Sequence, residues 1–147
     1  MSNTEETKSS YNGIVIFAAH PKDEVIGSFD VLNKYNNDQS ITIVYGPGVS
    51  NELQNKFLRL KEYFSCNQMI QNIVPPLLLS KDAMLFFPDP FSEVTPERRK
   101  WGYEGEYLAR RGYNVIFYTL SKNVPYIYEI NGREKKMEML NDIYPDN

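Results

Sequence analysis

The sequence is poor in the residues that usually build metal centres and disulfides. Its 147 residues include one cysteine, Cys66, and one histidine, His20. A single cysteine cannot form an internal disulfide, so we expect a reducing compartment. A catalytic zinc site takes three protein ligands from His, Asp, Glu or Cys. With one histidine, such a site would have to rely mainly on carboxylates.

Long hydrophobic runs and an excess of positive charge are also missing. No apolar stretch approaches the ~18 residues of a membrane span, and the polar start MSNTEETKSS lacks the pattern of a secretory signal. We therefore expect a cytoplasmic protein that does not enter a membrane. The chain has 16 Lys and Arg against 19 Asp and Glu, a net charge of −3. This balance argues against nucleic acid as a partner.

The composition is that of a globular protein. Hydrophobic residues make up 41% and aromatic residues 14% of the chain, which argues against wholesale disorder. The length suits one domain with a core of its own. Since no repeat or linker divides the chain, we predict a flexible arm over residues 1–10 and one domain over residues 11–147.

Apolar runs alternate with helical spacings along the chain. Continuous runs rich in β-branched residues predict strands buried on both faces of a parallel sheet. The predicted strands are 13–19, 41–45, 84–87 and 113–120, with a further one at 125–130. The predicted helices are 23–35, one that carries Leu53, Phe57, Leu60 and Phe64 on one face, 95–111 and 133–144. This alternation is typical of an α/β domain with a mostly parallel sheet.

Local signals mark where several of these helices begin and end. Asp23 and Glu24 suit the first turn of a helix, because acids favour its amino end. Thr95 is a good N-cap with Pro96 at the first helical position, and Gly112 is a natural stop. The remaining predictions are a cap at Ser50 or Asn51, a turn at Asn131–Gly132, and a short strand or packed loop at Leu77–Leu79.

Two polar segments follow predicted strands. In open α/β sheets, ligands bind beyond the carboxyl ends of the strands. Residues 20–24 follow the first strand, and residues 88–98 follow the strand at 84–87. A site formed by both segments would gather His20, Lys22, Asp23, Glu93, Thr95, Glu97 and Arg98.

The segment FAAHPKDEVIG at residues 17–27 resembles the opening motif of the LmbE-like (PIG-L) family, Ala-His-Pro-Asp-Asp-Glu after a first strand. Residues 95–98 lie where the family has His-Pro-Asp-His at the start of a later helix. Residues 59–62 and 136–145 are similar as well. The resemblance implies a three-layer, Rossmann-like α/β fold over residues 13–145. It also implies descent from metal-dependent deacetylases of N-acetylglucosamine conjugates.

The resemblance assigns roles that this sequence only partly keeps. It implies that His20 and Asp23 match two zinc ligands, whereas Arg98 stands at the third ligand position. A guanidinium stays cationic and does not normally bind metal. Lys22 replaces the carboxylate that would activate water, and Thr95 replaces a histidine that would assist with charge or proton transfer. No residue is therefore assigned a catalytic role.

Charge pairing is the expected replacement for the metal. Lys22 or Arg98 would pair with Asp23, Glu93 or Glu97, which would turn a metal site into a cluster of salt bridges. We expect no cofactor. The leading hypothesis is a degenerate, catalytically silent member of the family that acts as a binding or structural module. Its binding residues would be Lys22, Glu93, Thr95, Glu97 and Arg98.

Alternatives stay open. In one, the protein is an active deacetylase in which His20, Asp23 and a glutamate hold Zn²⁺ or another divalent metal. In another, a sugar pocket is kept without the chemistry, and Lys22 and Arg98 favour an anionic ligand such as a phosphorylated or carboxylated sugar. A protein partner is a further possibility for a binding module.

Overall fold

A computed structural model describes residues 13–35, 40–91, 95–119 and 130–145 of the chain. Its centre is a sheet of five strands in the order β3-β2-β1-β4-β5. Every neighbouring pair of these strands is parallel. The strands are β1 (Ile14–Ala18), β2 (Ile41–Tyr45), β3 (Asn67–Ile70), β4 (Met84–Pro88) and β5 (Asn114–Tyr118).

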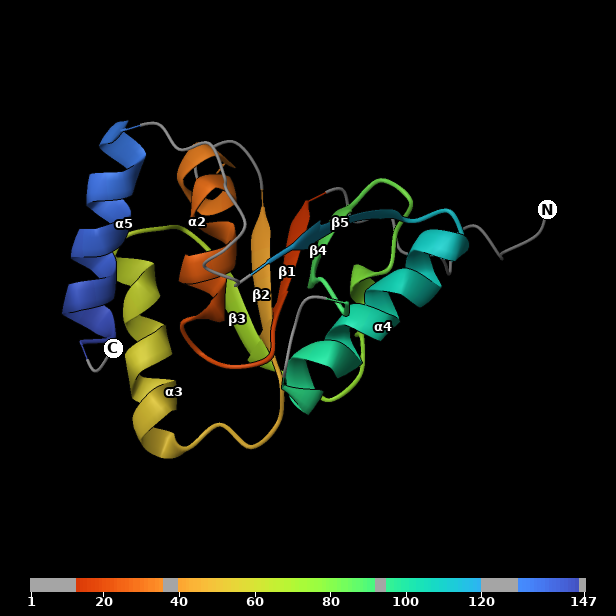
Figure 1. The fold of residues 1–147 in the computed structure, drawn as a ribbon, viewed down its shortest axis with the longest axis horizontal. Helices are drawn as coiled ribbons and strands as arrows, with labels where there is room; N and C mark the ends of the chain where they lie inside the picture. Colours follow the sequence, from red (N-terminus) through yellow and green to blue (C-terminus); the bar gives the residue numbers. More distant parts are fainter. Residues whose placement is uncertain (1–12, 36–39, 92–94, 120–129, 146–147) are drawn as a thin grey trace.

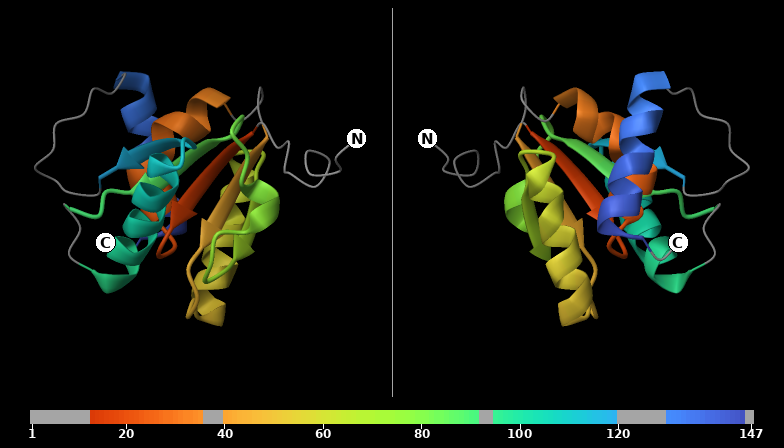
Figure 2. Two further views of the ribbon diagram at one scale, coloured as in Figure 1. Left: turned by 90° about the vertical axis from the view of Figure 1, so that its right-hand side faces the viewer. Right: turned by 90° about the vertical axis from the view of Figure 1, so that its left-hand side faces the viewer.

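Helices cover both faces of the sheet. One face carries α2, α3 and α5, and the other carries α4 (Figures 1 and 2). The helices are α2 (Asp23–Tyr35), α3 (Asn51–Leu58), α4 (Pro96–Arg110) and α5 (Ile130–Ile143), with 3₁₀ turns η1 (Arg59–Glu62) and η2 (Pro76–Leu78). The predicted α/β fold with three layers and a parallel sheet is confirmed.

Each face of the sheet has its own hydrophobic cluster. Alternate side chains of a strand point to opposite faces. Ile14 and Ile16 therefore join the cluster under α2 and α5, whereas Val15 and Phe17 join the cluster under α4. All of β1 is inaccessible to solvent. A strand buried on both faces has no polar side, which explains the unbroken apolar run in the sequence.

The predicted helix boundaries are largely confirmed. The hydroxyl of Ser50 accepts a hydrogen bond from the N–H of Leu53 at the start of α3. The hydroxyl of Thr95 does the same for Arg98 at the start of α4, where Pro96 is the first helical residue. Gly112 follows the end of α4 with a φ of 88°, a left-handed conformation that glycine adopts without strain.

Four sequence predictions on local structure need correction. Asn131 and Gly132 lie inside α5, which begins at Ile130, so they do not form a turn. Ile130 is therefore helical, and the rest of the predicted strand 125–130 lies outside the described residues. Of the two alternatives for Leu77–Leu79, the short strand is wrong, because residues 76–78 form a 3₁₀ turn. Pro75 and Pro76 lack the N–H groups that a ladder requires. The predicted helix with Leu53, Phe57, Leu60 and Phe64 on one face ends at Leu58, so Leu60 and Phe64 lie beyond α3, and Leu53 is exposed whereas the other three are buried.

The strand β3 was not predicted at all. Its sequence, Asn-Gln-Met-Ile, is half polar and only four residues long. It pairs with β2 alone and forms one edge of the described sheet. Short, polar edge strands are common because they limit pairing with other chains, and they give a weak hydrophobic signal.

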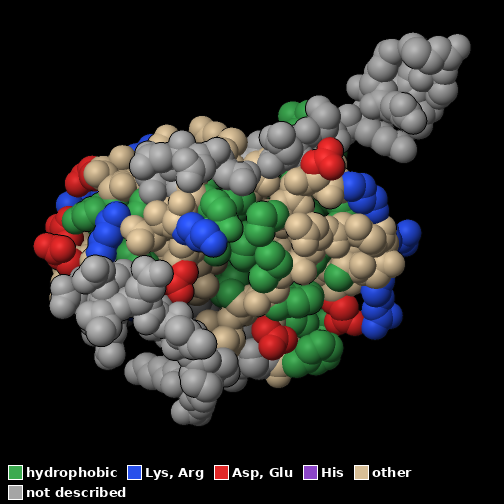
Figure 3. All heavy atoms as spheres, turned by 90° about the horizontal axis from the view of Figure 1, so that it is seen from above, with side chains coloured by type: hydrophobic (Ala, Val, Ile, Leu, Met, Phe, Trp, Pro, Cys, Tyr) green, Lys and Arg blue, Asp and Glu red, His purple; other side chains and the backbone are tan. Residues whose placement is uncertain are grey.

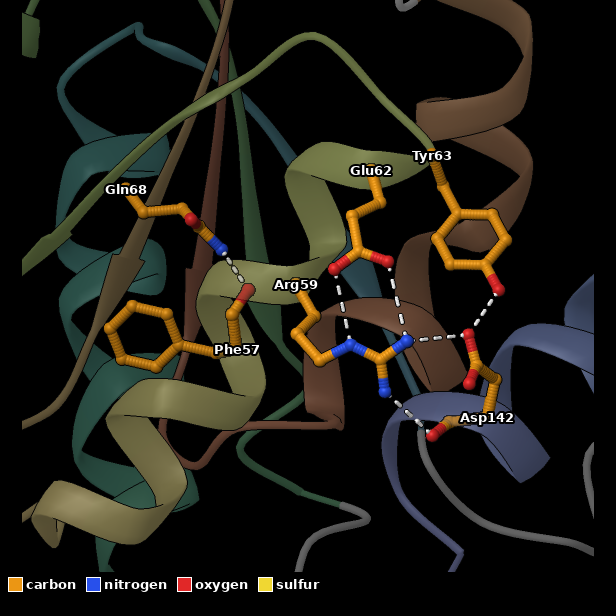
Figure 4. A network of polar contacts seen from close by, with 6 residues as sticks. All are labelled: Phe57, Arg59, Glu62, Tyr63, Gln68 and Asp142. Carbon is orange, nitrogen blue, oxygen red and sulfur yellow. Dashed lines mark hydrogen bonds and ion pairs between the residues drawn. The ribbon is translucent and has the colours of Figure 1, made fainter.

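The carboxyl-terminal helix is attached to η1 by polar contacts on the surface (Figure 4). The Arg59 guanidinium donates to the Asp142 carboxylate at 2.9 Å and to the Asp142 carbonyl at 3.0 Å. The Tyr63 hydroxyl donates to the same carboxylate at 2.5 Å, and Arg59 also pairs with Glu62. Two segments that are 79 to 83 residues apart in sequence are thereby held together.

Two further predictions concern the exterior and the amino terminus. Among the described helices, none is both long and apolar enough to cross a membrane. Viewed from above, the molecule shows hydrophobic side chains near the centre of its surface and charged side chains mostly around them (Figure 3). Residues 1–10 lie outside the described residues, so the amino-terminal arm stays a prediction.

Candidate functional site

The two predicted segments meet at the carboxyl ends of β1 and β4. These strands are neighbours, with β2 and β3 on one side and β5 on the other. This is the point where the strand order reverses, the usual place for ligands in such sheets. The first turn of α4 lies beside the turn that joins β1 to α2 (Figure 1), where Arg98 contacts Asp23.

Arg98 and Asp23 form a two-pronged ion pair. Arg98 Nε donates to Asp23 Oδ2 at 3.0 Å, and Nη2 donates to Oδ1 at 2.8 Å. Asp23 is 2% exposed and Arg98 is 24% exposed. Two parallel hydrogen bonds between ionised groups fix both the distance and the plane of the carboxylate. This ion pair is one of the pairings expected from the sequence.

His20 lies at the rim of the same site. Its imidazole is 43% exposed, and Nδ1 is 3.8 Å from Asp23 Oδ2, which is too long for a hydrogen bond. Its backbone N–H donates to the same carboxylate oxygen at 3.3 Å. The structure therefore brings the two sequence-predicted metal ligands together, with the backbone of one holding the carboxylate of the other.

Lys22 has the only positive φ of the described non-glycine residues, 93°. Such a conformation costs a residue with a β-carbon about 1–3 kcal/mol, so the surroundings must hold it there. The Lys22 carbonyl accepts from the N–H groups of Val25 and Ile26 at 3.0 Å, which closes the first turn of α2. The strained backbone thus sets where α2, and with it Asp23, begins.

The other predicted binding residues contribute less to the site. Thr95 accepts a hydrogen bond from the backbone N–H of Arg98 at 3.3 Å, so it acts as the cap of α4. Glu97 is exposed, and no described residue forms an ion pair with it. Glu93 lies outside the described residues.

Glu24 is buried next to the site. The sequence predicted only that it lies in the first turn of a helix. Its side chain is inaccessible to solvent, and its Oε2 accepts from the Tyr45 hydroxyl at 2.6 Å and the Tyr144 hydroxyl at 2.9 Å. Within the described part of the chain, its Oε1 has no hydrogen-bond partner. The partners lie 21 and 120 residues away, and no local signal in the sequence points to them.

Burial governs the protonation of this cluster. Desolvation raises the pKa of Glu24 to about 7, against the hydrogen bonds from both tyrosines, which lower it. Burial, followed by the nearby Glu24 carboxyl, raises the pKa of Tyr45 and of Tyr144 above the usual range. Both tyrosines therefore stay protonated and remain hydrogen-bond donors to Glu24 at any physiological pH.

The donor set at the site does not fit the divalent metal that the motif implies. Both oxygens of Asp23 already accept hydrogen bonds from a guanidinium. Arg98, at the position where the resemblance implies a third ligand, adds positive charge and offers no lone pair. Over the described ranges, no three side chains of His, Cys, Asp or Glu gather closely enough to hold a metal ion.

Solved structures that resemble this fold include the following two. One is the N,N'-diacetylchitobiose deacetylase from Pyrococcus horikoshii, with a TM-score of 0.64 and 15% identity over 99% of this chain and 76% of that chain. The other is the conserved protein TT1542 from Thermus thermophilus, with a TM-score of 0.58 and 13% identity over 88% of this chain and 77% of that chain. No family model and no curated protein matches the sequence.

At such low identity the likeness establishes the fold and nothing further. It confirms the fold relationship to a deacetylase that the motif at residues 17–27 implied. The residues that would carry the chemistry have to be judged from their own geometry.

Proposed function

We propose that this chain is a binding module on a deacetylase-like fold that does not carry out zinc-dependent deacetylation. The observation that carries the proposal is the ion pair between Arg98 and Asp23, in which one guanidinium occupies both oxygens of the carboxylate. Such a protein keeps the scaffold of an enzyme and uses the former site for binding.

The chemistry of hydrolysis supports this proposal. A zinc deacetylase needs a metal that lowers the pKa of its bound water to ~7 and a carboxylate that takes the proton. In this chain a cation, Lys22, stands where the resemblance places that carboxylate, and Arg98 stands at a ligand position. The site therefore lacks both the third metal ligand and the general base that this reaction requires.

The charges at the site favour an anionic small molecule as the ligand, with a phosphorylated or carboxylated sugar as the leading class. Lys22, Arg98 and the half-exposed His20 lie at the open carboxyl ends of the strands, and Asp23 is the carboxylate that partly balances them. The fold relationship to a deacetylase that acts on an amino-sugar substrate supports a sugar derivative. A protein partner is the competing kind of ligand.

Metal content is the first measurement. Tag-free protein would be incubated with Zn²⁺, desalted and analysed by mass spectrometry, because a polyhistidine tag would supply the missing ligands. We expect far less than one equivalent of metal per chain. Near-stoichiometric metal that disappears with Asp23→Ala would contradict the proposal. It would support the alternative, a rebuilt site of His20, Asp23 and a glutamate.

Hydrolysis and binding assays complete the test. We expect no release of acetate from N-acetylglucosamine conjugates in the presence of Zn²⁺; release that is lost with His20→Ala would show an active deacetylase. Calorimetry with N-acetylglucosamine 6-phosphate should show binding that weakens at least tenfold with Lys22→Glu. Arg110→Glu, at the exposed end of α4, is the matched charge control and should bind as the wild type does.

A further inference from the structure

We infer that two copies of this chain associate through the outer edge of β3, with their β3 strands antiparallel across a two-fold axis at Met69. This interface lies at the edge of the sheet and is independent of the function of the candidate site. Its basis is the unpaired backbone of β3, together with the uncharged and partly apolar surface beside it.

The backbone of β3 has one edge without a partner. β3 pairs with β2, and no other described strand lies beside it. The N–H of Gln71 donates to the Tyr45 carbonyl at 2.9 Å, which continues this pairing and fixes which residues face β2. Successive residues of a strand direct their backbone groups to opposite sides, so Met69 faces β2 as Gln71 does. The N–H and C=O groups of Gln68 and Ile70 therefore point away from the sheet, and no described residue bonds to them.

These outward groups are self-complementary. In an antiparallel pair of strands, residues that exchange two hydrogen bonds alternate with residues that exchange none. If Gln68 of one copy lies opposite Ile70 of the other, the two-fold axis repeats the same pair on the far side of Met69. All outward groups of both residues are then bonded. An interface that uses the same surface of both copies closes a dimer, the commonest kind of oligomer.

The segment that contains β3 lacks the charges that usually protect the edge of a sheet. Natural proteins place lysine or other charged residues on exposed edge strands, which prevents edge-to-edge pairing. Residues 63–80 contain no Asp, Glu, Lys, Arg or His, although charged residues make up 24% of the chain. The Lys100 ammonium donates to the Asn72 carbonyl at 3.1 Å, which is beyond the end of β3. Two of these segments can therefore meet without like charges between them.

Exposed apolar side chains lie beside this edge. β3 is short and half polar, so its backbone alone would hold a partner weakly. Ile73 is 61% exposed and Leu77 is 82% exposed. Leu77 belongs to η2, which lies next to β3 on the face of the sheet that carries α4 (Figure 2), and Leu78 of η2 is buried in the cluster against which Met69 packs. A second copy at the edge would remove part of this apolar surface from water, which favours association.

The antiparallel arrangement leaves both candidate sites open. A two-fold axis at Met69 joins the two sheets into one continuous sheet, in which the strands of the two copies run in opposite directions. The carboxyl ends of β1 and β4 then lie at opposite ends of the dimer. We therefore expect dimer formation and ligand binding not to compete.

Sedimentation equilibrium of the tag-free full chain measures the association. We expect the average mass to rise towards that of a dimer over about a hundredfold increase in protein concentration. Met69→Lys places two like charges across the axis and should abolish this rise. Tyr103→Lys adds the same charge at a residue of α4 that is 52% exposed, and it should associate as the wild type does. A wild type that stays monomeric throughout, or a folded Met69→Lys that still dimerises, would overturn the inference.

Disulfide formation tests the register and does not depend on how Met69→Lys folds. In a Cys66→Ser background, Met69→Cys places one thiol of each copy on either side of the axis, with Cα atoms about 4.5 Å apart. This separation suits a disulfide, so mild oxidation should convert most of the protein to a covalent dimer. Ile70→Cys in the same background is the matched control. Its side chain would lie at least about 7 Å from its copy, and the protein should stay monomeric on a denaturing gel.

The remaining outcomes also decide the question. Cross-linking of Ile70→Cys in place of Met69→Cys would show another register and overturn the proposed pairing. A wild type that dimerises although neither cysteine cross-links would place the interface elsewhere on the surface, with the same consequence. Retention of zinc or binding of a sugar phosphate would leave the inference unchanged, because both concern the other end of the strands.

Discussion

At the scale of single residues, the Arg98 guanidinium replaces the water that the buried Asp23 carboxylate has lost. Removing an ion from water costs several kcal/mol, and one partner with good geometry recovers most of that cost. Arg98 provides this geometry, with hydrogen bonds of 2.8 and 3.0 Å. A pair of this kind is expensive to break, because the remaining carboxylate would be buried without compensation.

We expect Arg98→Leu to lower the free energy of unfolding by about 2–3 kcal/mol, below the 3–5 kcal/mol of a fully buried pair because Arg98 is partly exposed. Arg110→Leu is the matched control. Arg110 is 78% exposed and pairs with Glu106 along the helix, so its loss should cost less than about 0.5 kcal/mol. Urea unfolding measures both variants.

The single variant Asp23→Asn and the double variant Asp23→Asn, Arg98→Leu complete a double-mutant cycle. Removing both charges should cost less than the sum of the two single changes, with a coupling of at least about 1 kcal/mol. Additive losses would mean that the two side chains do not interact in solution.

Glu24 makes stability depend on pH. Its pKa is raised by burial from 4.5 to about 7. The folded state therefore keeps a proton that the unfolded chain has already lost. The stabilisation is complete below pH 4.5 and is lost as the pH rises through about 7. At 1.36 kcal/mol for each pH unit, this loss amounts to about 3 kcal/mol of the free energy of unfolding.

The matching variant is Glu24→Gln, whose amide does not titrate. We expect the wild type to lose about 3 kcal/mol more than this variant between pH 4.5 and pH 8, as measured by urea unfolding at each pH. The comparison cancels the contributions of all other groups. Parallel pH profiles for the two proteins would contradict burial of a titrating Glu24.

At the scale of elements, the placement of Arg98 depends on how closely α4 approaches the sheet. A β-carbon built on Gly105 would lie 2.6 Å from the Phe87 ring, and one on Gly102 would lie 2.6 Å from the Pro88 carbonyl. Phe87 in turn stacks on Phe17 at 4.2 Å between ring centres. Because glycines have no side chain, α4 lies directly on β4 at these two positions. This close approach brings the first turn of α4 to the carboxyl end of β1.

Gly105→Ala should therefore destabilise the protein by about 1–3 kcal/mol through overpacking, although alanine favours helices over glycine by about 1 kcal/mol. Thermal unfolding measures the change. Ala109→Gly on the exposed face of α4 isolates the propensity effect and should cost about 1 kcal/mol. A stabilising Gly105→Ala would show that α4 does not pack against Phe87 at this distance.

At the scale of the whole molecule, α5 closes the core on one face of the sheet. Met139, Ile143 and Tyr144 are each at most 5% exposed, and they join the cluster that contains Phe29 and Leu32 of α2. Tyr144 also donates to Glu24, which follows Asp23 in the chain. The last residues of the described chain thus support the first turn of α2.

A chain that ends at residue 129 lacks this helix. Burying side chains of this size contributes about 1.5–3 kcal/mol each, so losing three removes about 5 kcal/mol or more from a stability that rarely exceeds 15 kcal/mol. We expect no cooperative thermal transition and strong binding of a hydrophobic dye. A chain that begins at residue 11, after the predicted arm, is the control and should melt as the full chain does. Equal melting of the two truncated chains would contradict the role of α5.

The sequence by itself determined the class of fold and most element boundaries. A strand buried on both faces must be apolar throughout, and a helix must begin where its free N–H groups find an acceptor, so β1 and the start of α4 at Thr95 could be predicted from neighbouring residues. Neighbouring residues do not predict β3 in the same way, because a strand at the edge of the sheet does not need apolar side chains throughout. Prediction from neighbouring residues also fails at Asn131–Gly132, where the helix continues through residues that favour turns.

The candidate site was predicted as a set of residues, and only the tertiary structure decided which of them pair. Asp23 and Arg98 are 75 residues apart, and Glu24 and Tyr144 are 120 apart. Many partners for Asp23 are compatible with the sequence, because charge alone does not select one carboxylate or one guanidinium. The order of the strands selects Arg98, since it places the ends of β1 and β4 side by side and α4 close enough to reach. Burial, which sets the protonation of Glu24, likewise exists only once distant segments have packed together.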